Sequence, residues 1–512
     1  MFDLGRSFLA SAERSPDALA VVDGDVRYTY NDWLTRIGAV AGALQGLGLK
    51  RADHLLVVLQ NRWQAATVHW ACQFLGVIVT PLNWRAKAEE VEYCARDADA
   101  KAVIFESVSA AAVAASSACS GIARIAVGLA GEGATGFDEL LRAPPPSTLV
   151  NATADDWSLM LYTSGTTGRP KGVPRRHRAE RAAAQAHIAQ NLYRNGERTL
   201  GVMPLYHTMG VRALLAMALA DGCFVCLPKF DAAQALKLIE QERITNLYLV
   251  PTLYHDLLAH PEFGRADVSS VTKLGFAGAP MPDALLKRLD AAFAPQVFAN
   301  HYGSSEIYTF TITQQAAKKP GSAGRAGINA RIRVVKLDAK DPDDFAGPGR
   351  EGQIIADLSG DEAFEGYWKR PDADAKALRS GWYFTGDTGY FDRDGDLFVT
   401  GRVDDMIVSG GENISPVEIE SVLSLHPAVD ETAVVGLQDE RWGQRVVAFV
   451  KRKSAVDANA LETHCKASGL PNFKRPRDYL FVREIPKSPV GKVLRRKLLA
   501  GEYEKDNAAE GK

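Results

Sequence analysis

The apolar residues of this chain follow two alternating patterns over roughly the first 300 positions. Runs of four or five apolar residues, typical of buried strands, are followed by longer segments in which apolar residues recur every three or four positions, as in amphipathic helices. This alternation predicts parallel sheets covered by helices. The expected strands span residues 55–59, 77–81, 102–105, 159–162, 200–203, 224–227, 246–250, 273–277 and 296–300. The expected helices span residues 62–75, 87–97, 208–220 and 232–242.

Turn and capping signals add detail near the N-terminus. Residues 18–30 predict a β-hairpin around Asp23-Gly24, and Asn31 is the expected N-cap of the helix that follows. The Ala- and Ser-rich tract 109–120 has the composition of a low-complexity segment, but also of a closely packed helix, which we favour.

The last third of the chain has a different pattern. Short strands and frequent turns after Ile332 predict a small β-rich subdomain. A further compact unit starts near Asp404, and Ser415 and Glu418 have the spacing of a helix capping box within it. The predicted fold class is α/β: a large N-terminal domain of wound parallel sheets flanked by helices plus the β-rich subdomain, residues 1–403, and a small α+β C-terminal domain, residues 404–512.

Composition excludes several classes of protein. A chain of 512 residues is too long for one core, and 46% apolar with 24% charged residues is typical of a soluble globular protein. No apolar run approaches the roughly 18 residues of a membrane span, and the N-terminus has no secretion signal. A net charge of -2 gives no general attraction to nucleic acid. We expect a cytoplasmic enzyme; the choice between monomer and homodimer stays open.

The cysteines are scattered, as thiols in a reducing compartment are. Only Cys223 and Cys226 lie close together, in an apolar strand where residues three apart point to opposite faces. No second Cys or His pair completes a set of four metal ligands. We therefore expect both cysteines in the core.

The stretch 161–173 reads Leu-Tyr-Thr-Ser-Gly-Thr-Thr-Gly-Arg-Pro-Lys-Gly-Val and is typical of a phosphate-binding loop. Glycines let backbone N–H groups approach an anion, hydroxyls add donors, and a lysine adds positive charge. The Walker-type loop is excluded, because Arg169 and Pro170 separate Gly168 from the lysine and no Ser or Thr follows it. A flexible linker has a similar composition, but needs neither the preceding apolar strand nor the following Pro-Lys-Gly. The loop residues are Thr163, Ser164, Gly165, Thr166, Thr167, Gly168 and Lys171.

Four further motifs follow in order along the chain. They are Tyr302-Gly303-Ser304-Ser305-Glu306, Tyr383-Phe384-Thr385-Gly386-Asp387, Gly401-Arg402-Val403-Asp404-Asp405 and Pro489-Val490-Gly491-Lys492. With the phosphate loop, this series resembles the adenylate-forming superfamily of acyl- and aryl-CoA ligases, luciferases and peptide-synthetase adenylation domains. The resemblance covers nearly the whole chain and is closest to the 4-chlorobenzoate and benzoate type of aryl-CoA ligase.

The resemblance implies a two-step reaction with ATP, Mg²⁺ and coenzyme A. A thiol does not attack a carboxylate at useful rates, because the leaving group would be oxide or hydroxide. Transfer of AMP to the carboxylate removes this obstacle, with release of pyrophosphate, and the acyl group then passes to coenzyme A with release of AMP. The first step is an in-line displacement at phosphorus, which needs donors around the phosphates, a metal ligand and a cation for the developing charge.

The same resemblance implies the nucleotide site. The phosphate loop would hold the β and γ phosphates, and Glu306 would bind Mg²⁺ with Thr166. Tyr302 would stack on adenine, and the residues that follow it in the motif, Gly303, Ser304 and Ser305, would also contact the nucleotide. Asp387 and Arg402 would bind the ribose hydroxyls, and Lys492 would bridge the carboxylate and the α-phosphate as the catalytic lysine. Taken singly, Glu306 could cap a helix, Asp387 could close a turn, Tyr302 could be ordinary core and Lys492 a solvated surface lysine.

The acid pocket implied by the resemblance has a mostly apolar lining. Such a lining suits a flat ring, so a small planar monoanion such as benzoate or furoate is expected. His207 is open to three interpretations: orienting the substrate, a buried hydrogen-bonded residue, or a helix cap. Arg212, one helical turn beyond Thr208, either points outward to water, as Arg usually does, or enters the cavity and favours a second carboxylate. The pocket residues are Tyr206, His207, Thr208, Met209, Phe276, Ala277, Gly278, Ala279, Gly303, Ile307, Tyr308 and Phe310.

The C-terminal unit is expected to move. Lys492 lies in it but acts in the large domain, so the resemblance implies rotation about a hinge at Asp404. After rotation Ser409, Gly410 and Gly411 would lie beside a tunnel for the pantetheine chain. Residues 473–497 contain nine basic side chains, which could meet coenzyme A phosphates or simply form a solvated helix face. The expected coenzyme A residues are Ser409, Gly410, Gly411, Trp442, Phe473, Lys474 and Arg475.

Three rival functions stay open. They are an aliphatic or dicarboxylic acid–CoA ligase, an enzyme that loads a carrier protein, and a non-catalytic adenylate sensor. The lack of a carrier domain after Lys512 favours free coenzyme A, and the occupation of every catalytic position by the expected residue type argues against a sensor.

Overall fold

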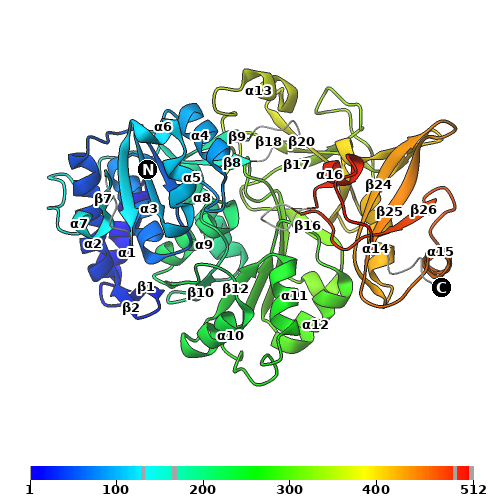
Figure 1. Cartoon of the computed structure of the whole chain (residues 1–512), viewed down its shortest axis with the longest axis horizontal. Helices are drawn as coiled ribbons and strands as arrows, with labels where there is room; N and C mark the ends of the chain where they lie inside the picture. The colour runs from blue at the N-terminus through cyan, green and yellow to red at the C-terminus, as the bar shows by residue number, and fades with distance from the viewer. Residues whose placement is uncertain (1, 129–132, 164–169, 488–492, 507–512) are drawn as a thin grey trace.

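The computed structural model has two sheets in the N-terminal part of the chain and a third in the C-terminal part (Figure 1). It describes residues 2–128, 133–163, 170–487 and 493–506. The first sheet has the order β7-β6-β5-β3-β4-β8-β9 and is parallel except for the last pair. Its strands are β3 (His54–Val58), β4 (Ile78–Pro81), β5 (Ala102–Glu106), β6 (Ala123–Val127), β7 (Thr135–Gly136), β8 (Trp157–Thr163) and β9 (Lys171–Arg176).

The second sheet continues from a parallel part into an antiparallel part. Its order is β17-β18-β20-β21-β16-β15-β14-β13-β12-β10-β11-β1-β2, with β19 beside β20. The parallel half is β1 (Leu19–Asp23), β10 (Arg198–Gly201), β11 (Cys223–Cys226), β12 (Asn246–Leu249), β13 (Lys273–Phe276) and β14 (Val297–Tyr302), with β2 (Val26–Thr29) at its edge. The antiparallel half is β15 (Thr311–Thr313), β16 (Ser322–Ala326), β17 (Ile332–Val335), β18 (Gly352–Asp357), β19 (Leu378–Arg379), β20 (Trp382–Phe391) and β21 (Leu397–Arg402).

Helices fill the space between these sheets and cover their outer faces. Helix α8 contacts β8 and β9 of the first sheet, helix α9 contacts β10, β11 and β12 of the second, and the two helices pack against each other. One apolar cluster runs from Leu55 through Ala184 and Val211 to Phe224. The N-terminal helices are α1 (Leu4–Arg14), α2 (Tyr30–Gly46), α3 (Trp63–Leu75), α4 (Ala88–Asp97), α5 (Ser107–Ala114), α6 (Ser117–Ser120), α7 (Phe137–Leu140), α8 (His177–Gln190), α9 (Thr208–Leu219), α10 (Ala232–Gln241), α11 (Pro251–Ala259), α12 (Asp283–Phe293) and α13 (Pro371–Ala377).

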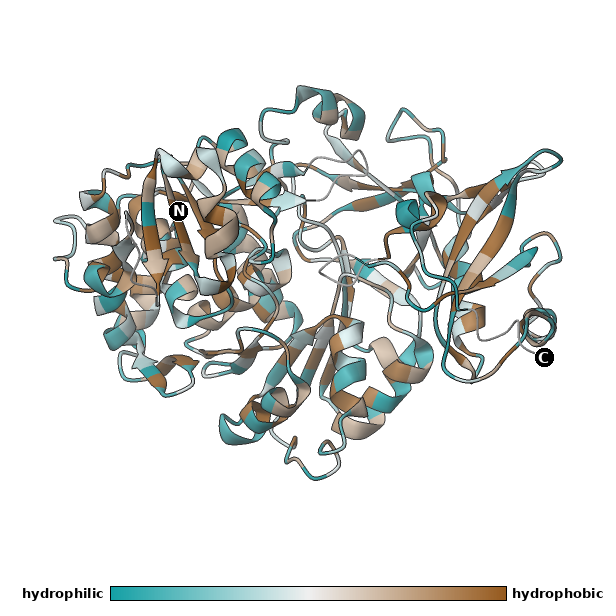
Figure 2. Cartoon of the chain, viewed as in Figure 1, coloured by the Kyte–Doolittle hydropathy of each residue, from teal (hydrophilic) through white to brown (hydrophobic). Residues whose placement is uncertain are grey.

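The C-terminal unit has its own sheet and core. Its strand order is β23-β22-β25-β24, with β26 parallel to β25, and Figure 2 shows β24 and β25 largely in the colours of apolar residues. Two apolar clusters pack on opposite sides of these strands, as expected for a sheet covered on both faces. The elements are β22 (Ile407–Ser409), β23 (Glu412–Ile414), α14 (Pro416–Ser424), β24 (Val429–Asp439), β25 (Gly443–Arg452), α15 (Ala458–Ala467), β26 (Asp478–Phe481) and α16 (Arg495–Leu499).

The predicted fold class is confirmed, with corrections at its details. The β-rich part shares the second sheet with the wound part, because β16 pairs with both β15 and β21. The tract 109–120 forms two short helices rather than one. The core position of Cys223 and Cys226 is confirmed, since they belong to different apolar clusters on the two faces of β11. The domain boundary at 403 and 404 stays a prediction.

One predicted helix cap was wrong, and the other is right in position but lacks the predicted hydrogen bond. Helix α2 begins two residues earlier than expected, and its cap is Thr29, whose hydroxyl accepts from the Asp32 N–H while Asp32 accepts from the Thr29 N–H. At the start of α14 the Ser415 hydroxyl donates instead to the Thr400 carbonyl oxygen. This hydroxyl therefore joins the C-terminal unit to β21 rather than closing its own helix.

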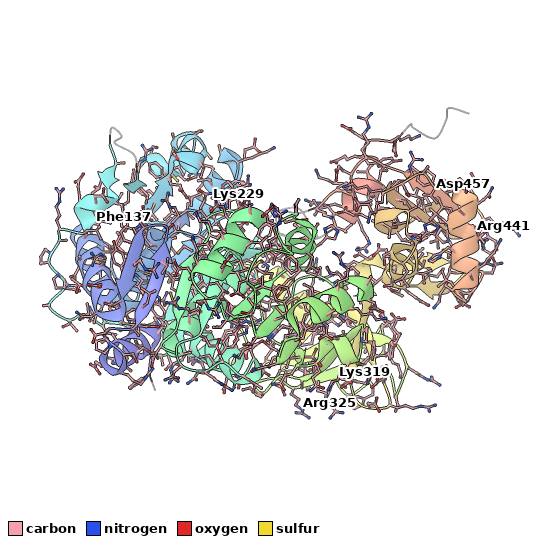
Figure 3. All side chains as sticks on the ribbon, turned by 90° about the horizontal axis from the view of Figure 1, so that it is seen from below. Phe137, Lys229, Lys319, Arg325, Arg441 and Asp457 are labelled. Carbon is pink, nitrogen blue, oxygen red and sulfur yellow. The ribbon has the colours of Figure 1, made fainter. Side chains whose placement is uncertain are left out.

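The turn 392–396 connects β20 to β21. Its three carboxylates, on Asp392, Asp394 and Asp396, surround the Lys319 ammonium at 2.5, 2.9 and 2.6 Å. These contacts raise the pKa of Lys319. A lysine thus occupies the position between carboxylates that a cation would take, and Figure 3 shows Lys319 and Arg325 along one edge of the molecule. None of the helices within the described ranges is long and apolar enough to cross a membrane.

Replacing Thr29 with alanine tests the observed cap. Thr29→Ala removes the acceptor for the Asp32 N–H at the start of α2, so the free energy of unfolding should fall by about 1 kcal/mol. Urea unfolding followed by circular dichroism gives this value. Thr35→Ala, at an exposed position in the same helix, should change it by less than about 0.5 kcal/mol. Equal effects of the two substitutions would contradict the capping role.

Candidate active site

The predicted phosphate loop spans the turn of an antiparallel hairpin. Thr163, the last residue of β8, pairs with Lys171, the first residue of β9. The Lys171 ammonium lies 4.2 Å from the centre of the Tyr367 ring, and burial lowers its pKa although Glu306 acts in the opposite direction. The loop residues Ser164, Gly165, Thr166, Thr167 and Gly168 lie outside the described part of the chain.

Contacts from other elements fix both arms of this hairpin. The Tyr162 hydroxyl donates to the Asp97 carboxylate at 2.7 Å, and the Tyr93 hydroxyl donates to the Pro170 carbonyl oxygen at 2.9 Å. The Trp368 N–H donates to the Gly172 carbonyl oxygen at 2.9 Å, and its indole N–H donates to the Asp97 carbonyl oxygen at 3.0 Å. The end of α4 and the segment around Trp368 therefore hold the loop at its base.

The loop from Gly303 to Phe310 follows β14 and folds tightly on itself. The Ser304 N–H donates to the Ile307 carbonyl oxygen at 2.9 Å, and the Ser304 hydroxyl accepts from the Glu306 N–H at 3.2 Å. A Cβ atom on Gly303 would lie 2.0 Å from the Tyr308 carbonyl oxygen. Only glycine fits there, which explains its place in the motif.

Glu306 is a buried carboxylate beside Lys171. Its Oε1 atom accepts from the Tyr367 hydroxyl at 2.7 Å. Its backbone carbonyl oxygen accepts from the Arg175 guanidinium at 2.8 Å, and the same guanidinium donates to the Glu362 carbonyl oxygen at 2.7 Å. Glu306 does not cap a helix, because it lies in the loop between β14 and β15.

Arg175 and Tyr367 were missed from the sequence. Arg175 forms an ion pair with Glu180 at 2.7 Å, with both side chains fully buried. The signal available was the Arg175-Arg176 pair next to the loop, since in a strand one of two neighbours must point inward. No comparable signal marks Tyr367, which reaches Glu306 from a segment far along the chain.

Tyr302, Asp387 and Arg402 lie together on three neighbouring elements. The Tyr302 hydroxyl, at the end of β14, donates to the Asp387 carboxylate at 2.6 Å. Asp387 on β20 pairs in register with Arg402 on β21, and their side chains form an ion pair at 3.1 Å. Burial, together with Asp387, raises the pKa of Tyr302 well above its ordinary value. Tyr302 also packs against Phe310, with ring centres 5.2 Å apart.

The predicted acid-pocket residues fall into two apolar groups. Met209, Phe276 and Ala277 belong to one cluster, with His207 and Thr208 at the start of α9 beside them. Ile307 and Phe310 belong to another cluster, with Tyr367 and Tyr383. Tyr206 and Ala279 are partly exposed and Gly278 is exposed. The structure supports the interpretation of His207 as a helix cap, because its Nδ1 atom accepts from the Met209 N–H at 3.4 Å.

Arg212 points inward, so the expectation that it faces water was wrong. Only 2% of its surface is exposed. Its Nη1 atom donates to the Thr309 hydroxyl at 2.5 Å and lies 3.5 Å from the Tyr308 carbonyl oxygen, and its Nη2 atom donates to the Tyr248 hydroxyl. Arg212 is therefore directly behind the loop that carries Ile307 and Phe310.

The expected coenzyme A residues lie on one part of the C-terminal unit. Ser409, Gly410 and Gly411 form the turn between β22 and β23, and a Cβ atom on Gly410 would lie 3.0 Å from the Trp442 ring. Trp442 and Phe473 are exposed, whereas Lys474 and Arg475 form ion pairs with Glu418 and Glu462.

The proposed hinge residue Asp404 lies in a 3-10 turn, Val403–Asp405, between β21 and β22. Its neighbour Asp405 forms an ion pair at 3.3 Å with Arg495, which also binds both Glu420 carboxylate oxygens. Arg495 therefore connects the turn to α16 and α14. The catalytic lysine candidate Lys492 lies three positions before Arg495, outside the described residues.

No three His, Cys, Asp or Glu side chains gather as a metal site in the part of the chain that the structure describes. Mg²⁺ usually takes only one or two protein carboxylates and completes its shell with water and substrate phosphates. Glu306, buried beside the phosphate hairpin, fits that requirement.

Comparison with known proteins agrees with this geometry. The chain matches the family described as AMP-binding enzyme over residues 8–368 and the AMP-binding enzyme C-terminal domain over residues 418–492. It is 35% identical to a 4-chlorobenzoate–CoA ligase of an Arthrobacter species, over 95% of this chain and 93% of that protein. It is 32% identical to the long-chain-fatty-acid–CoA ligase FadD13 of Mycobacterium tuberculosis, over 97% of each. The solved structure of the anthranilate CoA ligase AuaEII in complex with anthranoyl-AMP has a TM-score of 0.89 and 25% identity, covering 98% of this chain and 97% of that one.

The chain therefore belongs to the AMP-binding enzyme family, the adenylate-forming superfamily indicated by its motifs. It is an AMP-forming acyl- or aryl-CoA ligase that uses ATP, Mg²⁺ and coenzyme A.

Replacing Tyr302 with phenylalanine tests the contact between β14 and β20. Tyr302→Phe removes a hydrogen bond to a charged acceptor, Asp387, so the free energy of unfolding should fall by about 2 kcal/mol. Chemical denaturation of the protein without nucleotide measures this free energy of unfolding. Tyr390→Phe is the control: Tyr390 lies on β20, the strand of Asp387, but stacks on Phe398, so its replacement should cost less than about 0.5 kcal/mol. An unchanged stability of Tyr302→Phe would contradict the contact.

Proposed function

We propose that this ligase adenylates a small aromatic or heteroaromatic acid and transfers the acyl group to coenzyme A. The observation that carries the proposal is the arrangement around the phosphate hairpin, where Lys171 and Glu306 lie together and Tyr302, Asp387 and Arg402 form a linked group at the end of β14. Open α/β sheets bind ligands at the carboxyl ends of their parallel strands, and Tyr302 and Glu306 lie at and just after the end of β14.

In this proposal each group has one task in adenylation. The Asp387 carboxylate accepts hydrogen bonds from the ribose hydroxyls, and Arg402 orients it. Tyr302 forms part of the adenine site. Lys171 and the loop from Thr163 to Gly168 hold the β and γ phosphates with backbone N–H groups, hydroxyls and positive charge.

Glu306 and Thr166 would bind Mg²⁺, which would neutralise charge on the phosphates. Tyr367 holds one oxygen of Glu306, and Arg175 fixes its backbone, so the carboxylate keeps one orientation. Side chains held in this way need little rearrangement when the substrates bind.

The C-terminal unit supplies the remaining groups. Lys492 would bridge the carboxylate and the α-phosphate during adenylation. Rotation about Asp404 would then withdraw it and bring Ser409, Gly410 and Gly411 to the pantetheine chain, with Trp442 and Phe473 beside them. The exposed rings of Trp442 and Phe473 suit apolar contact with the pantetheine chain. Lys474 and Arg475 would meet the phosphates of coenzyme A.

Similar proteins support an aromatic acid as substrate, because one acts on 4-chlorobenzoate and another on anthranilate. The similarity to a long-chain fatty acid ligase favours an aliphatic acid as the second candidate. Phe276 and Met209, buried near the start of α9, suit a flat ring. Pyrophosphate exchange with ATP, measured for benzoate, furoate, malonate and a medium-chain fatty acid with and without coenzyme A, tests the proposal. Malonate or the fatty acid ahead of both aromatic acids by about tenfold in kcat/KM would contradict it.

Replacing Lys492 with alanine should separate the two half-reactions. Lys492→Ala removes a cation that acts only on the adenylation transition state, so adenylation should fall by about 100-fold or more. A supplied acyl-adenylate should still be converted to the thioester at a rate within about threefold of the original enzyme. Single-turnover assays of each step measure both rates. Arg496→Ala, a neighbouring basic residue, is the control, and similar losses in both half-reactions of Lys492→Ala would exclude the assigned role.

Proline at position 404 should trap one orientation of the C-terminal unit. Proline fixes φ near the value of a 3-10 turn, as found at Val403–Asp405, whereas a hinge must change its backbone angles. One half-reaction should fall by about tenfold or more while the other persists. The same single-turnover assays decide, with Asp404→Ala as the control. Normal rates of both steps in Asp404→Pro would show that the hinge lies elsewhere.

A further inference from the structure

Arg212 is a buried cation without a contacting anion. No carboxylate oxygen of the described residues lies within 4.0 Å of its guanidinium nitrogens. Its partners are uncharged: the hydroxyls of Tyr248 and Thr309 and the carbonyl of Tyr308. Its Nε–H group has no hydrogen-bond partner among these residues. Burial of a charge is costly unless an anion or a full set of hydrogen bonds compensates it.

Two buried carboxylates lie in this region, and one oxygen of Glu362, Oε2, has no hydrogen-bond partner among the described residues. Glu180 accepts from Arg175 at 2.7 Å and from the Tyr308 hydroxyl at 3.1 Å. Glu362 accepts from Asn329 at 3.2 Å, and burial raises its pKa despite the opposite influence of Arg212 and Arg175. Neither carboxylate lies within 4.0 Å of the Arg212 guanidinium nitrogens, so no direct ion pair compensates its charge.

Two buried histidines complete the surroundings of Arg212. The rings of His187 and His301 lie 4.7 and 5.3 Å from the Tyr248 ring that Arg212 contacts. Burial, with Arg212 nearby, lowers the pKa of both histidines well below the ordinary value, so they are neutral at pH 7. The charge of the group therefore comes from Arg212.

Asn191 determines which nitrogens of these histidines carry hydrogen. Its side chain lies 3.0 Å from His187 Nδ1 and 3.1 Å from His301 Nε2. The assignment that satisfies both contacts has the amide N–H donating to His187 and the amide oxygen accepting from His301. His187 then presents Nε2–H, which has no partner among the described residues. Two donors, on Arg212 and His187, are thus available around Tyr248.

The position of this group relates it to the acid site. Arg212 lies one turn along α9 from His207 and Thr208, and its partners Tyr308 and Thr309 lie between Ile307 and Phe310. The Tyr308 carbonyl oxygen that faces Arg212 also lies against Gly303. The Tyr308 backbone therefore lies between Arg212 and Gly303.

We propose that the acid substrate carries a second carboxylate, bound by Arg212 and His187, and is an aromatic or heteroaromatic ring with an acid substituent. The inference rests on the proposed function, because it assigns the distal end of the same acid site. The guanidinium would use Nε–H and, with a shift of the Tyr248 hydroxyl, Nη2 for a two-point contact with the carboxylate. The second carboxylate would compensate the buried charge, whereas an apolar group would leave it unpaired.

Matched pairs of acids test this proposal by pyrophosphate exchange. The pairs are benzoate with isophthalate and terephthalate, and 2-furoate with 2,5-furandicarboxylate. In at least one pair the diacid should exceed the monoacid by about tenfold or more in kcat/KM, since a site built for a polar group rejects analogues that lack it. In Arg212→Met the ratio of diacid to monoacid should fall by about 100-fold, and Arg212→Lys should lie between. Arg265→Met, an exposed arginine, should keep the original ratio.

The outcomes separate this proposal from the function on which it rests. Two outcomes would overturn the second-carboxylate site and leave the ligase proposal intact: a higher kcat/KM for the monoacid than for the diacid in every pair, or an unchanged ratio of diacid to monoacid kcat/KM in Arg212→Met. If Arg212→Met does not fold, the panel with the original enzyme decides alone. If no acid supports exchange, the proposed small-acid activity fails. The Arg212 site is then judged by thermal unfolding, where a diacid must raise the midpoint of the original protein but not of Arg212→Lys.

Discussion

The buried ion pair of Arg175 and Glu180 holds the candidate active site together. Arg175 comes from the strand that follows the phosphate loop, and its guanidinium binds the backbone of the Glu306 loop and of Glu362. Loss of one partner of such a pair leaves an uncompensated buried charge and typically costs about 3–5 kcal/mol. Three segments far apart in the sequence thus depend on one side chain.

This ion pair is also connected to Arg212 through Tyr308. The Arg175 guanidinium lies 4.1 Å from the centre of the Tyr308 ring, and the Tyr308 hydroxyl donates to Glu180. Arg212 lies on the other side, 5.8 Å from the same ring. The loop that carries Glu306 and Tyr308 is therefore contacted by two buried arginines, Arg175 at the Glu306 carbonyl oxygen and Arg212 at the Tyr308 carbonyl oxygen and the Thr309 hydroxyl.

Parallel strands and the hairpin place the remaining groups. Strands β12, β13 and β14 end side by side, which brings Phe276 and Tyr302 to one edge of the second sheet. The β8–β9 hairpin belongs to the first sheet, and helices α8 and α9 fill the space between the sheets. The site thus forms where both sheets and these helices meet, and Figure 1 shows the C-terminal unit beside the β-rich half of the second sheet.

The sequence alone determined the alternation of strands and helices, the α/β class and the family. These features depend on local periodicity, glycine-rich turns and motif residues that are contiguous along the chain, as in the loop at Gly303. It also determined that Cys223 and Cys226 are buried, because strand period and apolar neighbours specify this without knowledge of the rest of the fold.

The tertiary structure alone decided the contacts that join distant segments. Tyr367 binds Glu306 across 61 positions, and Arg212 meets Tyr308 across 96, separations that no local pattern encodes. The cap at Thr29 and the contact of Ser415 with Thr400 differ from the sequence prediction because several polar partners compete for each hydroxyl. The inward position of Arg212 has the same cause: buried hydroxyls and a carbonyl on other elements offer its guanidinium hydrogen bonds, whereas the sequence around it gives only the general preference of arginine for water.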